Sequence, residues 1–353
     1  MTAVTDRVPT ETYTCPFSQQ QLERVFSLLV DNRPLQICEV FSGNINTIVK
    51  VASGGRCYGL RVRTQEGVYR YEPDLVKEAF IVWLLNHARG TISDKDVASA
   101  FAQILRNRRG SITGSSRLLP SVLRYDWSRQ VLPYPYCIYE WEEGEPLWNV
   151  SEPQLYRLAG QTLTQIHQIQ FSAFYADFLS VGIQPISWEA RYLAALDKEL
   201  ATARGSLDLL SANILKAMTV SASISCAPCL VHNDFSPGNI LVRDETIAAV
   251  IDWDNAVIDV PHLDFVKMKY WTAKNARGEL AHAPTLFSAF VDGYGPAGRE
   301  IVASSLFCLY EALWLLRVFN FERAKEEQGL PRAPGYPAAS IYRKHLKEVL
   351  NKL

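Results

Sequence analysis

The sequence has almost no net charge. Its 353 residues include 36 Lys and Arg against 37 Asp and Glu, which gives a formal net charge of −1. A chain with this balance has no global field that would attract nucleic acid or an anionic membrane, so we expect neither as a partner. The content of 48% apolar and 21% charged residues fits a soluble globular protein, and the length allows two lobes with sizeable cores.

Long hydrophobic segments are also missing. The most apolar stretch covers residues 301–319, and Glu311 and Arg317 interrupt it, so we expect a buried helix and no membrane span. Residues 1–10 lack the basic and apolar blocks of a signal peptide. These absences lead us to expect a cytoplasmic protein.

The cysteines give no sign of a disulfide framework. There are seven of them, an odd number spread along the chain, which fits free thiols in a reducing compartment. Cys226 and Cys229 form a CxxC pair, but a structural zinc site needs a second pair of ligands at suitable spacing, and none is evident. We therefore expect this pair to lie in a loop that enters a strand.

One part of the chain contains the polar residues that a phosphoryl-transfer site needs. Residues 230–242 read LVHNDFSPGNILV, and residues 247–254 read IAAVIDWD. Asp234 and Asn239 enclose four residues, and Asp252 follows thirteen residues later. A hydroxyl that attacks ATP needs a carboxylate to orient it and accept its proton, while Mg2+ on the phosphates prefers hard oxygen ligands. The residue types and their spacing match this requirement.

The same segment predicts a hairpin. Residues 239–242 and 248–251 are expected to form two strands joined near residues 243–245. A hairpin would bring Asn239 and Asp252 to the same end, close enough to share a metal ion.

These motifs resemble the aminoglycoside phosphotransferase and choline kinase superfamily. The resemblance runs from about Gln36 to about Gly329. It implies an α+β, protein-kinase-like bilobal fold. The N-terminal nucleotide-binding lobe would cover residues 1–140 with a small antiparallel sheet, and a larger, mainly helical catalytic and substrate-binding lobe would cover residues 141–353.

The resemblance also implies roles for the matching residues and two cofactors, ATP and Mg2+. Asp234 would be the catalytic base, Asn239 and Asp252 would bind Mg2+, and His232 would brace the catalytic loop. Asn233 is typical of the choline, ethanolamine and thiamine kinase branches. The later segment IDWD is more typical of the antibiotic kinases, so the acceptor stays open.

The expected phosphate-covering hairpin lies near the start of the N-terminal lobe. Residues 35–41 and 47–51 alternate like strands around the turn from Ser42 to Asn46, and this arrangement resembles the family's hairpin, where small residues let backbone N–H groups approach phosphate.

The next strand supplies a cation. Alternation along residues 57–63 places Gly59, Arg61 and Arg63 on one face, and in a kinase a small residue over adenine and a cation on the phosphates share a face. We expect Arg61 in this role, with Lys50 and Arg63 as the alternatives. By resemblance, Glu78 on the helix expected over residues 73–87 would pair with Arg61.

The rest of the N-terminal lobe contains the hinge and an insertion. By resemblance, backbone groups near Glu140, Trp141 and Glu142 would bind adenine. Residues 90–120 are an insertion of unknown purpose, in which residues 94–107 have the pattern of an amphipathic helix.

The C-terminal lobe contains residues that could contact an acceptor. Helices are expected over residues 154–169, 188–201 and 208–220, with His167 and Asp264 in structural roles. Carboxylates and aromatic faces suit an amine or a quaternary ammonium group, and the alternative for the same residues is an ordinary core. The candidate substrate residues are Asp254, Asp259, Trp271, Glu311 and Trp314.

These observations predict an ATP- and Mg2+-dependent O-phosphotransferase that acts on a hydroxyl of a small, amine-bearing metabolite or antibiotic. The alternatives are a choline, ethanolamine or thiamine kinase, a kinase of natural-product biosynthesis, and a nucleotide-binding pseudokinase that serves as a scaffold or regulator. A protein kinase is disfavoured because no Ala-Pro-Glu segment follows the motif. The sequence leaves the oligomeric state unknown.

Overall fold

The fold comes from a computed structural model of the chain. It describes residues 15–27, 29, 34–42, 46–63, 74–87, 92–112, 121–203, 209–222, 224, 226–272, 280, 283–332 and 336–353. The chain divides into two compact units. The N-terminal unit contains Met1–Trp83, Gln103–Ser116 and Pro120–Glu142, and the C-terminal unit contains Leu84–Ala102, Arg117–Leu119 and Glu143–Leu353. The main junction, between Glu142 and Glu143, lies two residues beyond the end expected for the first lobe.

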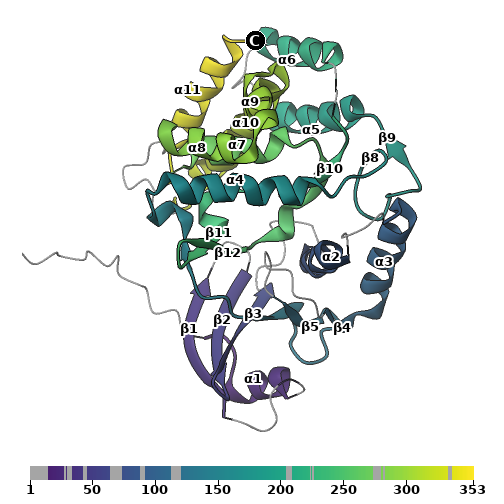
Figure 1. The fold of residues 1–353 in the computed structure, drawn as a ribbon, viewed down its shortest axis with the longest axis vertical. Helices are drawn as coiled ribbons and strands as arrows, with labels where there is room; N and C mark the ends of the chain where they lie inside the picture. Colours follow the sequence, from purple (N-terminus) through teal and green to yellow (C-terminus); the bar gives the residue numbers. More distant parts are fainter. Residues whose placement is uncertain are drawn as a thin grey trace, which may run out of the picture. The chain divides into compact units, whose positions relative to one another are not determined.

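The N-terminal unit is built on an antiparallel sheet of six strands in the order β1-β2-β3-β6-β5-β4 (Figure 1). Strand β4 lies within the expected insertion at residues 90–120, so part of that insertion extends the sheet. The strands are β1 (Gln36–Ser42), β2 (Asn46–Ser53), β3 (Arg56–Arg63), β4 (Arg109–Ile112), β5 (Val122–Asp126) and β6 (Tyr136–Glu140).

The two faces of β3 have different neighbours, as the alternation predicted. Tyr58, Leu60 and Val62 belong to an apolar core that also contains Leu22 and Phe26 of helix α1 (Gln19–Phe26). Ser18 begins α1 with a capping box, in which its hydroxyl accepts from the Gln21 N–H. Gly59 and Arg61 alternate with these residues on the opposite face of the strand and are also buried.

Two helices follow β3 in the sequence. Helix α2 spans Asp74–His87 and α3 spans Asp94–Asn107, which are the ranges that the hydrophobic pattern predicted to within one residue. Each helix begins in one unit and ends in the other.

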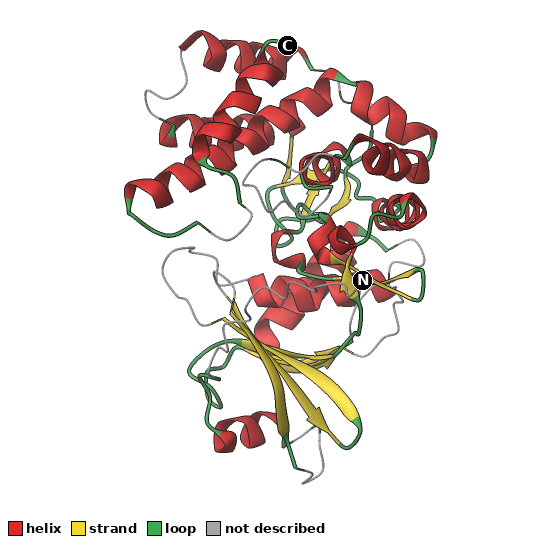
Figure 2. Ribbon diagram, turned by 90° about the vertical axis from the view of Figure 1, so that its left-hand side faces the viewer, coloured by secondary structure: helices red, strands yellow, loops and turns green. Residues whose placement is uncertain are grey.

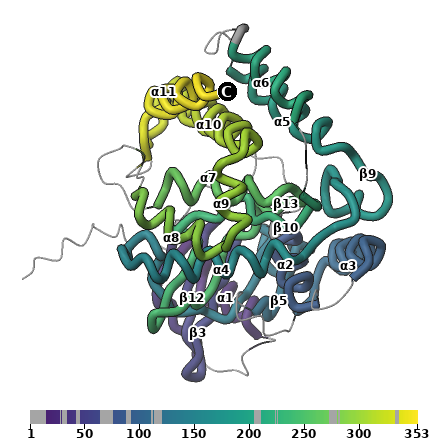
Figure 3. Tube along the Cα trace, turned by 45° about the horizontal axis from the view of Figure 1, so that its top comes forward, coloured from purple at the N-terminus to yellow at the C-terminus, as the bar shows by residue number. Residues whose placement is uncertain are grey.

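The C-terminal unit is mainly helical, as Figure 2 shows by colour. Helix α10 packs against α5, α7, α9 and α11, and Figure 3 shows α11 alongside it. The helices are α4 (Pro153–His167), α5 (Trp188–Thr202), α6 (Leu209–Ser221), α7 (His262–Tyr270), α8 (Pro284–Tyr294), α9 (Pro296–Ala303), α10 (Ser305–Glu327) and α11 (Ala339–Leu350).

Helices α4 and α8 approach each other unusually closely. A Cβ atom at Gly160 would run into the backbone oxygen of Phe290, and a Cβ atom at Gly293 would run into the backbone oxygen of Arg157. Glycine at both positions therefore allows the two backbones to touch.

Short strands and 3-10 turns hold the motif segment. Strand β10 (Cys229–Val231) pairs with β13 (Val257–Asp259), and the two strands between them in the sequence, β11 and β12, form a second sheet of order β12-β11-β7. The predicted hairpin is present as β11 (Ile240–Arg243) and β12 (Thr246–Val250). The remaining short elements are β7 (Glu145–Pro146), β8 (Phe174–Tyr175), β9 (Pro185–Ile186), η1 (Leu147–Asn149), η2 (Pro237–Asn239) and η3 (Trp253–Asn255).

The seven cysteines are free thiols. Within the described ranges no single helix is long and apolar enough to cross a membrane, and only α9 and α10 taken together have that length and composition, with a bend of 66° between them.

Candidate active site

His232 links the catalytic loop to the end of the hairpin. Its Nδ1 accepts a hydrogen bond from the Asp234 N–H at 3.2 Å, so its Nε2 is left to donate to the Ile251 carbonyl at 3.0 Å. The ring is buried against Trp253, with 4.3 Å between the ring centroids. His232 thus contacts both the catalytic loop and the end of the hairpin, as its expected bracing role requires.

Asp264 holds the same loop from helix α7. Its carboxylate is 1% exposed and accepts hydrogen bonds from the backbone N–H groups of His232 at 2.8 Å and Asn233 at 2.6 Å. The His167 Nε2 lies 3.1 Å from the same carboxylate, and its Nδ1 lies 2.9 Å from the Tyr294 hydroxyl. Asp264 and His167 thus have the structural roles that were expected of them.

The two predicted metal ligands lie side by side. Ile240 pairs with Val250 in the hairpin, and the Ile251 N–H donates to the Asn239 carbonyl at 2.9 Å, so Asp252 follows the residue opposite Asn239. The predicted sharing of one hairpin end is confirmed. Asp252 has a left-handed backbone, with φ 66°.

The donor set of this pair fits a magnesium ion. The Asn239 Nδ2 donates to the Asp234 carbonyl at 2.9 Å. This contact uses the amide nitrogen, so the Asn239 Oδ1 is the side-chain atom that could bind a metal ion. A carboxamide oxygen and a carboxylate are hard ligands, and Mg2+ takes its remaining ligands from water and nucleotide phosphates. Among the described residues, no group of three or more His, Cys, Asp or Glu side chains is arranged to hold a metal ion.

Asp234 has two nitrogen partners that the sequence interpretation missed. Its Oδ1 forms an ion pair with Lys267 Nζ of helix α7. Its Oδ2 lies 3.4 Å from Asn255 Nδ2, and the Asn255 carbonyl accepts from the side chain of Asn233 at 3.0 Å. A signal existed for Lys267, because it follows Asp264 by three residues and so shares its helix face.

In the N-terminal unit, Arg61 pairs with Glu78 as predicted. The distance from Arg61 Nη1 to Glu78 Oε2 is 2.5 Å, and both side chains are buried. With its amide oxygen turned toward the guanidinium, Asn46 accepts from Nη2 at 2.7 Å and from Nε at 3.1 Å. Tyr139 donates its hydroxyl to the same Glu78 oxygen at 2.5 Å. Asn46 and Tyr139 therefore fix the ion pair in place.

The face of β3 around Gly59 is covered by an aromatic ring. A Cβ atom at Gly59 would lie 3.2 Å from the indole of Trp141, and this indole stacks on Phe41 with 5.9 Å between the centroids. Lys50 Nζ, one of the alternative cations, lies 4.8 Å from the Trp141 ring centroid and is therefore engaged in a cation–π contact.

Part of the predicted nucleotide-binding backbone is already used within the sheet. The Glu140 N–H donates to the Ser121 carbonyl and the Trp141 N–H to the Cys57 carbonyl, each at 3.1 Å. These two N–H groups are therefore already engaged and do not face an adenine ring. Ser42 ends β1, whereas residues 43–45 of the expected phosphate-covering turn lie outside the described residues.

Two of the carboxylates expected to contact an acceptor lie in buried ion pairs. Asp259 is 6% exposed and accepts from Arg191 Nε at 3.1 Å and from the Tyr310 hydroxyl at 2.5 Å. Glu311 is 2% exposed and pairs with Lys269. Both carboxylates are balanced by the chain's own cations, so we do not carry them into an acceptor site.

The candidate aromatic residues form a cluster at the end of α7. The Trp271 ring lies at right angles to Tyr336, with centroids 4.9 Å apart, and edge-on to Trp314. Trp314 is 5% exposed, and its indole N–H has no hydrogen-bond partner within the described part of the chain. Burial raises the pKa of the Tyr336 hydroxyl to about 12, and the charges of Asp234, Glu322 and Asp252 add to the effect. Asp254, the remaining candidate, lies in the 3-10 turn η3, which begins directly after Asp252.

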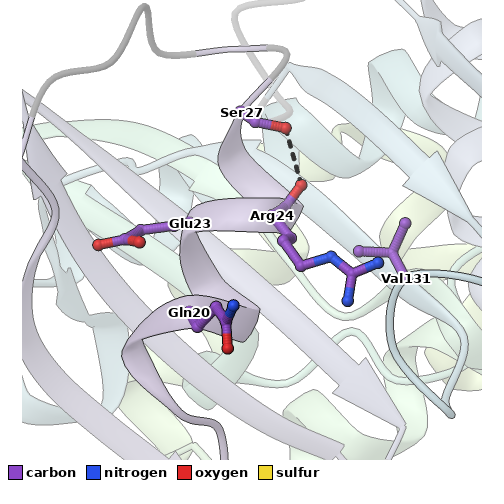
Figure 4. A pocket seen from close by; sticks show the side chains of 5 residues that line it. All are labelled: Gln20, Glu23, Arg24, Ser27 and Val131. Atoms are coloured by element: carbon purple, nitrogen blue, oxygen red, sulfur yellow. Dashed lines mark hydrogen bonds between the residues drawn. The ribbon is translucent and has the colours of Figure 1, made fainter.

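A separate pocket of about 360 Å³ lies on helix α1. Figure 4 shows its lining residues, which include Glu23, Arg24 and Val131. None of the predicted site residues lines it, so we do not assign it to the reaction.

The comparisons with known proteins agree with this geometry. A model of the phosphotransferase enzyme family matches residues 42–303. A search of curated proteins gave no match. Among solved structures, a thermostable mutant of aminoglycoside phosphotransferase APH(4)-Ia, in a ternary complex with AMP-PNP and hygromycin B, is similar with a TM-score of 0.64 and 15% identity, over 94% of this chain and 98% of that chain.

Two further aminoglycoside phosphotransferases have similar structures. APH(2'')-Ib with bound ADP has a TM-score of 0.54 and 16% identity, over 95% of this chain and 97% of that chain. The complex of gentamicin with APH(2'')-IIa has a TM-score of 0.55 and 14% identity, over 96% of this chain and 98% of that chain. These likenesses confirm the predicted protein-kinase-like α+β fold. Because the family model covers most of the sequence, the chain belongs to the phosphotransferase enzyme family.

Proposed function

We propose that the protein transfers the γ-phosphoryl group of ATP to a hydroxyl of a small molecule, with Mg2+ as a cofactor. The observation that carries the proposal is the joint placement of Asp234, Asn239 and Asp252 by one loop and one hairpin, with His232 bonded to both. A pair of hard oxygen ligands beside a carboxylate base is what phosphoryl transfer to a hydroxyl requires.

Each residue has a role in this proposal. Asp234 orients the acceptor hydroxyl and takes up its proton, while Asn239 and Asp252 would hold the metal. Mg2+, when bound, would supply positive charge against the phosphate oxygens. Arg61, fixed by Glu78, neutralises phosphate charge in a loose transition state, where electrostatic stabilisation is the main contribution of the protein.

Nucleotide binding has support from similar proteins. The APH(4)-Ia and APH(2'')-Ib structures contain AMP-PNP and ADP, and both resemble this chain in fold. The buried ion pair of Arg61 and Glu78 supports the same interpretation, because it fixes a permanent positive charge in the lobe that is proposed to bind the nucleotide.

We propose an amine-bearing acceptor as the first class to test. The similar structures bind hygromycin B and gentamicin, and the aromatic faces of Trp271 and Tyr336 suit an ammonium group. Asp254 is the carboxylate that we keep for this role. Choline-like alcohols, thiamine and natural-product intermediates are the competing acceptors.

An ATP-consumption screen tests the proposal. The panel contains aminoglycosides, choline-like alcohols, nucleosides and hydroxy amino acids, each with and without Mg2+, and Asp234→Ala is the inactive reference. We expect acceptor-dependent ATP consumption by the natural sequence alone, and only with Mg2+. Tight ATP binding without transfer to any acceptor would instead support the pseudokinase alternative.

A further inference from the structure

Lys267 lies against the carboxylate that the proposed reaction uses as its base. Its Nζ forms an ion pair with Asp234 Oδ1, and the side chains of Lys267 and Asp234 are 20% and 19% exposed. The second carboxylate oxygen lies 3.4 Å from Asn255 Nδ2. A nitrogen donor therefore lies beside each oxygen of Asp234, and partial burial protects the ion pair from screening by solvent.

Helix α7 contacts three consecutive residues of the loop through one face. Lys267 and Asp264 are three residues apart, so their side chains are neighbours on the helix. Asp264 accepts from the backbone N–H groups of His232 and Asn233, and Lys267 contacts the side chain of Asp234. Asp264 thus fixes the backbone of the loop, whereas Lys267 limits the rotation of the Asp234 carboxylate.

The positive charge of Lys267 also offsets repulsion between Asp234 and the negative charges near it. Asp234 and Asp252 bring two carboxylates to the end of the loop and hairpin, and the proposed nucleotide adds its phosphates. Repulsion among these groups favours a rotated Asp234 side chain, because like charges at short range cost free energy. The ammonium group offsets this repulsion and keeps the carboxylate in one orientation.

We propose that Lys267 is a positioning residue for the phosphoryl-transfer base. It holds Asp234 by Oδ1 and presents Oδ2 to the acceptor hydroxyl. The inference rests on the proposed function, and it adds a residue outside the HxDxxxxN and IDWD segments. Misplacement of a reacting group by about 1 Å can cost 10²-fold in rate, and this sets the size of the expected effect.

Steady-state kinetics of four variants test the proposal. Lys267→Met should lower kcat about 10²-fold with little change in the KM for ATP, and Lys267→Arg should recover most of the loss. Ethylammonium added to Lys267→Ala should restore part of kcat, whereas it should not help Lys267→Met, whose side chain fills the space. Lys216→Met is the control, because it removes an exposed ion pair with Asp197 in the same unit.

A cycle of melting temperatures tests the contact without any catalytic assay. The Tm shifts of Lys267→Met and Asp234→Ala should be non-additive in the double variant, because each change removes the same ion pair. Additive Tm shifts would overturn the inference even if no acceptor were found. If the natural sequence transfers phosphate, an unchanged kcat in Lys267→Met, or no response of Lys267→Ala to ethylammonium, would also overturn it. Failure of the natural sequence on every acceptor would count against the proposed function alone.

Discussion

Replacement of Asp264 by Asn should weaken both the fold and the catalytic loop. The carboxylate is 1% exposed and accepts from the N–H groups of His232 and Asn233, at 2.8 and 2.6 Å. Asn has the same shape but only one acceptor oxygen. The NH₂ group of the new Asn side chain would therefore face one of the two backbone N–H groups that donate to the carboxylate in the natural sequence.

The size of the effect follows from these contacts. A hydrogen bond to a charged group contributes about 1.5–3 kcal/mol, and a buried donor left without a partner costs about 1–3 kcal/mol. Loss of one such bond with one unsatisfied N–H gives roughly 3–5 kcal/mol for Asp264→Asn. Since domains have about 5–15 kcal/mol of stability, the variant should still fold at low temperature.

Urea unfolding followed by circular dichroism measures this change as a difference in the free energy of unfolding. Asp292→Asn is the matched control, because it breaks a 2.9 Å pair with Arg299 at an exposed site and should cost less than about 1 kcal/mol. The kcat of Asp264→Asn should also fall under conditions where the variant is fully folded. A free energy of unfolding within 1 kcal/mol of the natural sequence would refute the account of Asp264 as the anchor of the loop.

Three further changes have definite expected outcomes. Gly160→Ala should lower the free energy of unfolding by about 1–3 kcal/mol, because a Cβ atom there meets a backbone carbonyl of α8. Tyr139→Phe removes the 2.5 Å hydrogen bond to Glu78, so the KM for ATP should rise about fivefold while kcat changes little. Burial lowers the pKa of His262 to about 4, below the value near 6.5 in an unfolded chain, so the unfolded state binds the proton first as the pH falls. Stability should then decrease by about 2 kcal/mol between pH 7 and pH 5, as urea unfolding at the two pH values would measure.

The outcomes that would contradict these predictions are equally concrete. Gly160→Ala should lower the free energy of unfolding far more than Gln161→Ala, which changes an exposed position on the same helix. Equal free energies of unfolding for the two variants would contradict the close approach of α4 and α8. An unchanged KM for ATP in Tyr139→Phe would mean that Glu78 needs no partner besides Arg61. A pH dependence that persists unchanged in His262→Gln would have to come from other groups.

Local patterns predicted the parts of the site that lie close together in the sequence. The hairpin that brings Asn239 and Asp252 to one end depends on a period of two and a short turn, and both are visible in the sequence of residues 239–252. The contact between Arg61 and Glu78 followed from alternation along one strand together with the family resemblance, and the structure contains it.

The parts that escaped prediction depend on packing between distant segments. Tyr139 reaches Glu78 because β6 pairs with β3, and no local pattern reveals which strands become neighbours. Lys267 reaches Asp234 because α7 packs against a loop more than thirty residues earlier. For the same reason Asp259 and Glu311 could be suggested as acceptor contacts, although their partners Arg191 and Lys269 bury them in ion pairs.

The central claim is that Asp234 supports transfer of a phosphoryl group to a hydroxyl. The direct measurement is mass spectrometry of the acceptor after incubation with ATP and Mg2+, for the natural sequence and for Asp234→Asn at equal folded concentration. The account predicts a phosphate adduct on the acceptor with the natural sequence and none above background with Asp234→Asn. An adduct formed at a near-normal rate by Asp234→Asn would contradict it.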